Sequence, residues 1–431
     1  MTRNAEASLL AAASVLAAIG VTLANFAAGG GLDAQVALTF LVFALSFGGI
    51  HVALRRWAPS ANPYLFPLAA FLAAIGFIMV YRLDHELAAL QRWSMLVAGA
   101  ACAFLLFILR NEGVAMLRRY RYVFLLAAVA LLLLPLLPEG LPVHGVEVFG
   151  SRLWVRIELP LGGRTLSFQP GEIAKVLLTI FLASYLADRY LVMASTDRKL
   201  GPVTLPDLRQ LFPVVLAGAA AFFVLIYQRD LGASLLLFGL FIGMMYIATG
   251  RGSYLAIGAV FVGVAGFAAY RMFDHVERRV VAWLRPFEDF ADSGYQIAQS
   301  LFALGSGSIT GAGIGLGRPD LIPAAPTDFI FAAVGEEIGF AGSIAVIAAY
   351  SLLIAAGFGI ALRARDVFRK FLAAGLTLVL GMQAVLIIAG VIRLLPVTGI
   401  TLPFMSYGGS SLVANMVMIT LLARISHGER T

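Results

Sequence analysis

The feature that most constrains this chain is a series of long apolar runs separated by short polar connections. A helix needs about 17–25 residues to cross the hydrocarbon core of a bilayer, and about twelve runs are of that order. They fall near residues 8–28, 35–54, 64–81, 91–109, 121–137, 171–190, 212–228, 231–249, 254–273, 329–359, 371–392 and 407–425. The sequence therefore predicts an all-α polytopic integral membrane protein with about twelve transmembrane helices.

The amino-acid composition supports a membrane protein and argues against a soluble domain, a cysteine metal site and a nucleic-acid partner. The chain is 61% hydrophobic and 13% charged, about half the charged fraction of a soluble domain. Cys102 is the single cysteine, which excludes an intramolecular disulfide and a cysteine metal site. The net charge of +7 is not clustered into a stripe, so we expect no nucleic-acid partner and attribute the charge to basic loops near anionic headgroups.

The distribution of basic residues predicts the orientation. With twelve spans, more than half of the 31 basic residues fall on one side of the membrane, which should be cytoplasmic and should carry both termini. The first run resembles a signal peptide, but a second run follows directly, so we expect an uncleaved helix. Two long outer loops, 138–170 and 274–328, keep arginines of their own. Either these arginines bind a phosphate-bearing ligand, or long loops translocate regardless of charge.

A glycine-rich polar stretch, 294–339, interrupts the apolar pattern and contains Asp328 directly before an apolar run. Such an insertion between membrane spans is typical of a functional loop. Asp328 has two interpretations: it caps the following helix, since Asp is among the best N-cap residues, or it acts as a general base at the membrane boundary. Gln296, in the same stretch, is a candidate substrate contact.

The segment Ser167–Lys175 opens the sixth span. Pro170 suits the first helical turn, and Glu172 suits a helix N-terminus. Lys175 opposes the helix dipole there and needs an anionic partner. That partner is either Glu172 at i,i+3 or a ligand, and the two roles are compatible.

Several further polar residues interrupt the spans. Asp230 is expected to cap the eighth span, and Arg229 either contacts a headgroup or snorkels. Adjacent Glu336 and Glu337 need partners inside the bundle, and we expect one of them to approach Lys175. The remaining candidates are Arg393 at the end of the eleventh span, and Ser410 and Ser411, which close an irregular stretch from 395 and suit an anion at a helix N-terminus.

Four stretches together resemble one family. They are FQPGEIAK (168–175), QRDLGAS (228–234), the run from GYQIAQS to GEEIGF (294–340) and LLPVTGITLPFMSYGGSS (394–411). On these motifs the chain resembles a SEDS protein (shape, elongation, division and sporulation) of the RodA/FtsW type. SYGGSSLVAN with IRLLP is closer to RodA-type members, which favours cell elongation and shape over division.

The resemblance implies a peptidoglycan glycosyltransferase that polymerises lipid II outside a bacterial cytoplasmic membrane. It implies a class B penicillin-binding protein as partner, with other elongation or division proteins, and leaves a divalent cation (Mg or Mn) as one way of meeting leaving-group charge. The family core has ten spans, so residues 1–60 would add two N-terminal helices to a core over 61–431. By position, Asp328 matches the family's essential aspartate, Glu172 and Lys175 its polar pair, and Ser406–Ser411 its signature.

The chain departs from the family pattern at three positions. Arg229 replaces the usual proline, Gly171 replaces the usual serine, and Arg393 ends a segment that often contains asparagine and glycine. Two rival functions stay open. A lipid-linked oligosaccharide transporter (flippase) would depend more on the interior Glu and Lys than on Asp328. A non-catalytic scaffold that activates a penicillin-binding protein would lose partner binding, not turnover, when loop residues change.

Overall fold

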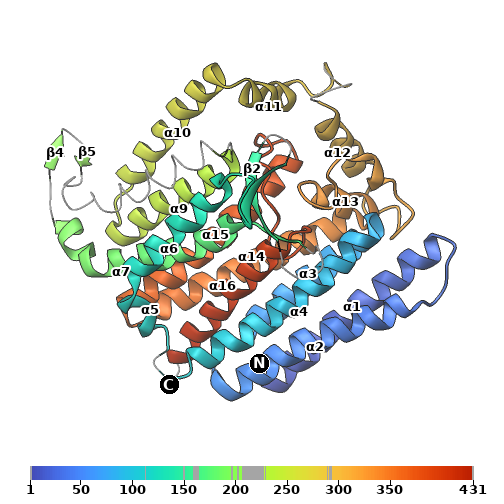
Figure 1. The fold of residues 1–431 in the computed structure, drawn as a ribbon, viewed down its shortest axis with the longest axis horizontal. Helices are drawn as coiled ribbons and strands as arrows, with labels where there is room; N and C mark the ends of the chain where they lie inside the picture. The colour runs from blue at the N-terminus through green and yellow to red at the C-terminus, as the bar shows by residue number, and fades with distance from the viewer. Residues whose placement is uncertain are drawn as a thin grey trace.

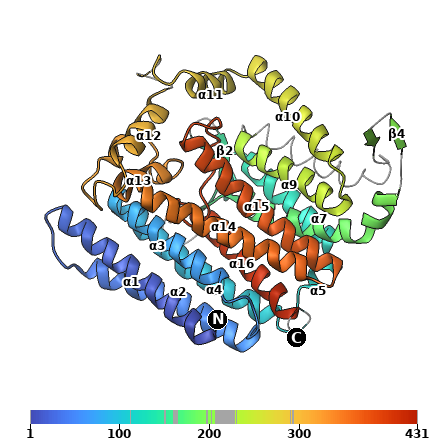
Figure 2. The same ribbon diagram turned by 180° about the vertical axis from the view of Figure 1, so that it is seen from behind.

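The structure is a computed structural model. It describes residues 2–429 apart from 112, 149–150, 159–164, 196–197, 201–202, 206–227, 229, 289 and 291–293. Figure 1 shows a bundle of long, roughly parallel helices with an arch of shorter helices along one end. The same arrangement is visible from behind in Figure 2.

The all-α membrane architecture is confirmed. Ten helices among the described residues are long and apolar enough to span a bilayer. They are α1 (Arg3–Ala27), α2 (Ala34–Trp57), α3 (Leu65–Leu83), α4 (His85–Ile108), α7 (Pro170–Ser195), α9 (Leu231–Thr249), α10 (Ser253–Met272), α14 (Gly339–Arg363), α15 (Val367–Val391) and α16 (Gly409–Gly428). The predicted span over 121–137 is the shorter helix α6 (Arg121–Leu133), which follows α5 (Ala115–Arg119) and ends in a 3₁₀ turn, Leu134–Leu136. The predicted span over 212–228 lies outside the described residues, except Gln228.

The prediction of one continuous span over 329–359 is wrong. The segment forms two helices, α13 (Ile330–Glu337) and α14, which meet at Gly339 with φ +73°. A Cβ on Gly339 would lie 2.3 Å from the backbone nitrogen of Gly311. The glycine-rich loop therefore enters the break between the two helices, and only a residue without a side chain fits the left-handed backbone there.

The core of the bundle is built from α3, α7, α15 and α16, which are its most buried spans. Small residues allow close approach: a Cβ on Gly76 of α3 would lie 2.3 Å from the backbone of Met405. The irregular stretch between α15 and α16 is thus packed directly against a central helix. This agrees with the rule that non-helical backbone at membrane depth must be buried in protein or line a cavity.

The arch consists of α10, α11 (Asp274–Leu284) and α12 (Tyr295–Ser306), at the top of Figure 1. Of the ten spans, α10 is the least buried. A loop with a 3₁₀ turn at Pro319–Leu321 then leads from α12 to α13. The arch thereby carries the chain from α10 across to the end of the bundle where α13 lies.

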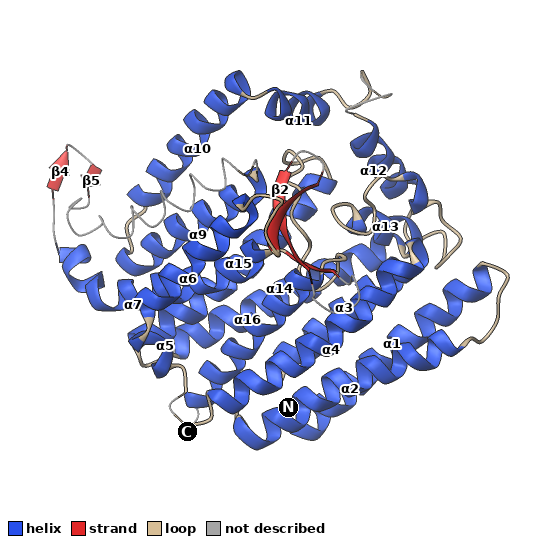
Figure 3. Cartoon of the chain, viewed as in Figure 1, coloured by secondary structure: helices blue, strands red, loops and turns tan. Residues whose placement is uncertain are grey.

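The long loop over 138–170 contains a small antiparallel sheet, shown in Figure 3. Its strands are β1 (Val143–Val148), β2 (Ser151–Glu158) and β3 (Thr165–Phe168), in the order β1-β2-β3, and Val155 pairs with Phe168. The last strand leads directly into α7. A second pair, β4 (Arg198–Leu200) and β5 (Val203–Leu205), follows α7.

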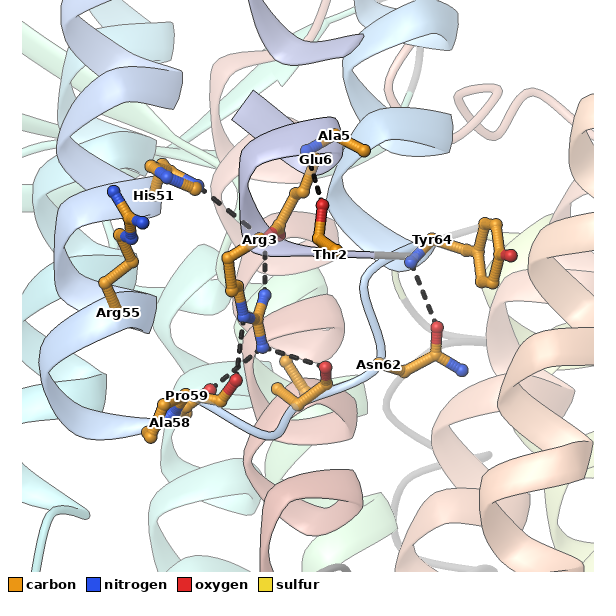
Figure 4. Close-up of polar contacts among 12 residues, drawn as sticks. Thr2, Arg3, Ala5, Glu6, His51, Arg55, Ala58, Pro59, Asn62 and Tyr64 are labelled. Atoms are coloured by element: carbon orange, nitrogen blue, oxygen red, sulfur yellow. Dashed lines mark hydrogen bonds and ion pairs between the residues drawn. The ribbon is translucent and has the colours of Figure 1, made fainter. Parts of the chain in front are cut away.

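The N-terminal hairpin, α1 and α2, packs against α3 and α4. A polar cluster joins its start to the α2–α3 connection, as Figure 4 shows. Arg3 pairs with the fully buried Glu6, which also lies 3.7 Å from His51. The Arg3 guanidinium donates to the carbonyls of Ala58, Pro59 and Ala61 at 2.8–3.0 Å.

The same connection is bound to the end of α16. The Asn62 N–H donates to Ser426 Oγ at 2.8 Å, and Ser60 contacts His427. Both termini therefore lie at one end of the bundle (Figure 1), as the predicted topology requires. The cytoplasmic location of that end stays a prediction.

We expect Arg3→Ala to destabilise the folded protein by about 3 kcal/mol, because it removes the partner of a buried carboxylate. The measurement is the thermal unfolding midpoint of the purified protein in detergent. Arg55→Ala is the matched control, since its guanidinium contacts Asn4 at an exposed site, where a change within about 0.5 kcal/mol is expected. Equal midpoints for the two variants would contradict the structural role of Arg3.

Candidate functional site

Asp328 lies in the turn that leads into α13, but it does not cap that helix. The N-cap residue is Phe329, and no side chain caps the helix. The N–H groups of Asp328 and Phe329 both approach the carbonyl of Ala324, at 3.2 and 3.4 Å, so the turn tightens before the helix begins. The capping interpretation is wrong, since this turn moves the helix start past Asp328.

The carboxylate instead lies near Arg279 of α11, and both groups are close to Gly399. A Cβ on Gly399 would be 3.8 Å from Asp328 Oδ2 and 3.7 Å from an Arg279 nitrogen. Arg279 Nη1 also approaches the carbonyls of Val397 and Thr398, at 3.5 and 3.4 Å. The sequence placed Arg279 among the loop arginines without selecting it, and the amphipathic pattern of α11 is the signal that could have done so.

Burial raises the pKa of Asp328 to about 6, although the positive charge of Arg279 and a hydrogen bond from Thr327 lower it and Asp230 raises it further. A carboxylate with a pKa near neutrality can accept a proton more readily than an ordinary one. Asp328 is thus a carboxyl of raised pKa that lies near the guanidinium of Arg279.

On the other side of Gly399, α7 contributes an ion pair. Lys175 is buried, and its Nζ lies 2.5 Å from Glu172 Oε2 and donates to Gln383 Oε1 at 2.7 Å. Gln383 in turn donates to the Thr401 carbonyl at 2.7 Å. The i,i+3 pairing predicted for Lys175 is confirmed, and Pro170 is the first residue of α7, as expected.

The expected approach of Glu336 or Glu337 to Lys175 is wrong. Glu337 pairs with Arg82 of α3 at 3.2 Å, and Glu336 accepts from the N–H of Arg318 at 2.7 Å. Both carboxylates accept hydrogen bonds from backbone N–H groups of the loop before α13. Their partners come from distant parts of the chain and could not be found from sequence spacing.

Asp230 caps α9, as predicted: its Oδ1 accepts from the N–H of Ala233 at 2.8 Å. Burial raises the pKa of Asp230 to about 6, with hydrogen bonds from the helix start lowering it and the charge of Glu172 raising it. Arg229 lies outside the described residues.

These polar groups line two adjacent cavities. Both cavities border the backbone segment between α15 and α16, residues 392–408, which we call the linker; its residues Gly399 and Ile400 line both cavities. Asp328 lines the first cavity, with Leu386, Gly390, Val397 and Thr398 among its neighbours. The second cavity is lined by Glu172, Lys175, Asp230, Gln383 and Thr401, among others. The structure therefore brings four predicted polar residues, Asp328, Glu172, Lys175 and Asp230, to the two sides of one linker.

The serines of the signature fix this linker in place. Ser410 Oγ accepts from the Gln169 N–H at 2.9 Å, at the start of α7. Ser411 Oγ accepts from Thr401 Oγ1 at 2.7 Å and from Asn415 Nδ2 at 3.1 Å. Ser406 donates to the Thr327 carbonyl at 2.5 Å, which ties the linker to the turn that holds Asp328.

Two further candidates lie apart from this group. Arg393 donates to the carbonyls of Trp283 and Leu284, each at 2.8 Å, and accepts from Trp283 Nε1 at 3.1 Å. It locks the end of α11 to the end of α15, and so positions the helix that carries Arg279. Gln296 is exposed on α12 and lines neither of the two cavities. Substrate contacts by these two residues stay predictions.

The divalent-cation alternative finds no ligand set in the described part of the chain. No group of three or more His, Cys, Asp or Glu side chains gathers there in a way that could hold a metal. Near the two aspartates, Lys175 and Arg279 are basic side chains that the structure describes.

Comparison with known proteins gives a consistent result. The family model described as cell cycle protein, FtsW/RodA/SpoVE, matches residues 63–431. The chain is 40% identical over 438 residues to a Mycobacterium tuberculosis protein named peptidoglycan glycosyltransferase RodA, covering 99% of this chain and 91% of that protein.

Two solved structures have a similar fold. One, with TM-score 0.67 and 25% identity, comes from a study titled structural coordination of polymerization and crosslinking by a peptidoglycan synthase complex; the match covers 86% of this chain and 98% of that one. The other is the rod shape determining protein RodA of Thermus thermophilus, with TM-score 0.58, 25% identity and the same coverage.

We expect Asp328→Asn to stabilise the protein at alkaline pH. Because the folded pKa of about 6 exceeds the unfolded value near 3.9, ionisation destabilises the fold above pH 6, by about 1–3 kcal/mol. That penalty decreases as pH falls from about 6 toward 3.9 and is lost below about 3.9, where the carboxyl is protonated in both states. Unfolding midpoints at pH 8 and pH 5 measure this difference.

The exposed Asp320→Asn is the control and should shift the midpoint little at either pH. A stabilisation by Asp328→Asn that is the same at pH 5 and pH 8 would contradict the raised pKa.

Proposed function

This chain belongs to the FtsW/RodA/SpoVE family of cell cycle proteins, and from that membership and its site we propose that it is a peptidoglycan glycosyltransferase that polymerises lipid II. The predicted SEDS resemblance is confirmed. The observation that carries the proposal is that Asp328, a carboxyl with pKa about 6, lies near Arg279 beside Gly399, while the buried Lys175 lines the adjacent cavity.

The reaction is glycosyl transfer with inversion. Asp328 accepts the proton of the acceptor sugar's 4-hydroxyl as that oxygen attacks the anomeric carbon of the lipid-linked donor. The new C–O bond forms as the bond from the anomeric carbon to the pyrophosphate oxygen breaks, and undecaprenyl pyrophosphate leaves with the bonding electrons. A positioned general base typically contributes about 10²–10⁴-fold to such a step.

The two cations share one task and are held in different ways. Lys175 and Arg279 offset the charge that develops on the pyrophosphate, from opposite sides of the linker. Glu172 and Gln383 hold the Lys175 ammonium in one position, so that little reorganisation is needed as charge develops. Arg279 is held by the carbonyls of Val397 and Thr398, which keeps it beside Asp328 without requiring the two to form a close ion pair.

The protein is multi-pass in the membrane. In the proposed arrangement this is the bacterial cytoplasmic membrane, with both termini in the cytoplasm and Asp328 facing outward. The partner is a class B penicillin-binding protein that crosslinks the glycan. In support, one similar chain comes from a study of how a peptidoglycan synthase complex coordinates polymerization and crosslinking. The relative named RodA supports a role in elongation.

We expect Asp328→Asn, purified with its partner, to polymerise lipid II at least about 100-fold more slowly than wild type, because the amide cannot accept the proton. The measurement is the appearance of glycan strands from labelled lipid II. Asp320→Asn, on the same loop and exposed, is the control and should retain wild-type turnover.

Near-normal polymerisation by Asp328→Asn would eliminate the general-base role. If the wild-type protein, reconstituted in vesicles, moves labelled lipid II across the bilayer but does not polymerise it, the flippase function is favoured. Loss of partner binding with intact turnover would favour the scaffold.

A further inference from the structure

The glycine-rich loop before Asp328 is clamped onto the end of α13. The N–H groups of Ala312 and Gly313 donate to the carbonyls of Glu336 and Glu337 at 2.9 and 3.0 Å. The side chain of Glu337 accepts from the Gly315 N–H at 3.1 Å. These bonds occupy carbonyl and carboxylate groups at the end of a buried helix, where unpaired polar groups are costly.

Arg82, near the end of α3, completes the clamp. Its Nε lies 3.2 Å from Glu337 Oε1, and its Nη2 donates to the Gly317 carbonyl at 3.2 Å. Glu337 is almost fully buried, so loss of this partner would leave an uncompensated charge. The orientation of Arg82 therefore matters to the position of α13, whose first residue follows Asp328 by two positions.

Helix α1 reaches this clamp by two contacts. A Cβ on Gly315 would lie 2.5 Å from Ala27 Cβ and 3.6 Å from Ala24 Cα, so the loop rests directly on the last turn of α1. In addition, Tyr81 donates from its hydroxyl to Asn25 Oδ1 at 2.9 Å. Tyr81 immediately precedes Arg82.

The packing between α1 and α3 is close along its length. A Cβ on Gly20 would lie 2.2 Å from Ile78 Cδ1, and both helices run toward the end of the bundle where α13 lies (Figures 1 and 2). The last turn of α1 is thus a fixed surface rather than a loose end. It lies outside residues 63–431, the part matched by the family model.

We propose that the last turn of α1 is a positioning element for the reaction: through Ala27 and Asn25 it holds the 307–317 loop and Arg82 against Glu337, and so keeps α13 and Asp328 in place. The inference rests on the proposed glycosyltransferase function for its kinetic consequences. The contacts themselves do not depend on that function.

The test substitutes Ala27→Leu, which forces a larger side chain against Gly315. Ala28→Leu is the matched control, because Ala28 is exposed and follows the end of α1. We expect Ala27→Leu to lower kcat for lipid II polymerisation about tenfold with KM nearly unchanged, since small misplacements of a reacting group are costly. Ala28→Leu should behave as wild type.

The pH dependence separates positioning from general destabilisation. Arg279 and Asp230 are the charged groups that act on Asp328, whose pKa is raised to about 6 chiefly by burial. If α13 shifts and water enters, the pKa of Asp328 falls, and the acid limb of kcat/KM moves to lower pH. A loss of folded enzyme alone would lower the rate without moving that limb.

A second pair of variants keeps the test decisive if Ala27→Leu does not fold. Asn25→Ala and Tyr81→Phe each remove the same hydrogen bond, so their effects on kcat should be similar and non-additive in the double variant. Wild-type kcat and pH profile in these variants, or equal losses in Ala27→Leu and Ala28→Leu, would overturn the proposal.

Hydrogen exchange provides a readout that does not require turnover. We expect faster exchange over 311–317 and α13 in Ala27→Leu than in wild type, and no change in Ala28→Leu. If the wild-type complex fails to polymerise lipid II, the proposed function fails, and exchange alone decides whether α1 holds the loop. Unchanged exchange in Ala27→Leu would contradict the positioning role.

Discussion

A charge buried in a membrane protein must have a partner within a few ångströms, because neither lipid nor apolar side chains can solvate it. The long-range contacts at one end of this bundle follow from that constraint. Lys175 is held by Glu172 and Gln383, and Glu337 by Arg82 and a loop N–H. Asp328 and Asp230 differ from these groups, since no side chain salt-bridges either carboxyl in the described structure. Burial raises the pKa of each to about 6.

The linker between α15 and α16 brings Asp328, Asp230 and the Glu172–Lys175 pair to two adjacent cavities, because Gly399 and Ile400 line both of them. Glycine makes its packing possible: a Cβ on Gly232 would lie 2.5 Å from the Thr398 carbonyl. Gly399, with φ +74°, brings the backbone between the two cavities without a side chain to separate them. Serines then fix the linker to α7 and to the turn before Asp328. Rigid backbone thus places the cations and the base relative to one another before substrate arrives.

Features with a local cause could be predicted from the sequence. Residues within about one helical turn determine the Pro170 start of α7, the Asp230 cap and the Glu172–Lys175 pair. Each apolar run is a single continuous stretch of sequence. Features with a distant cause could not. Because a turn closes on the carbonyl of Ala324, α13 begins after Asp328 and not at it. The predicted span over 329–359 is interrupted at Gly339, where Gly311 packs against the backbone. The sequence could not single out Arg279, because Asp328, which it approaches in the fold, is 49 positions away in sequence. Asp328 itself became the leading candidate from the family resemblance and not from residue spacing.

If Asp328 accepts the proton in glycosyl transfer, its ionisation controls the pH dependence of lipid II polymerisation by the wild-type complex. A base must be ionised to act, so kcat/KM should fall about tenfold per pH unit below the pKa of Asp328, which is about 6. We expect an acid limb of kcat/KM with its midpoint near pH 6. A rate that stays flat from pH 8 down to pH 4.5, with the complex still folded, would contradict it.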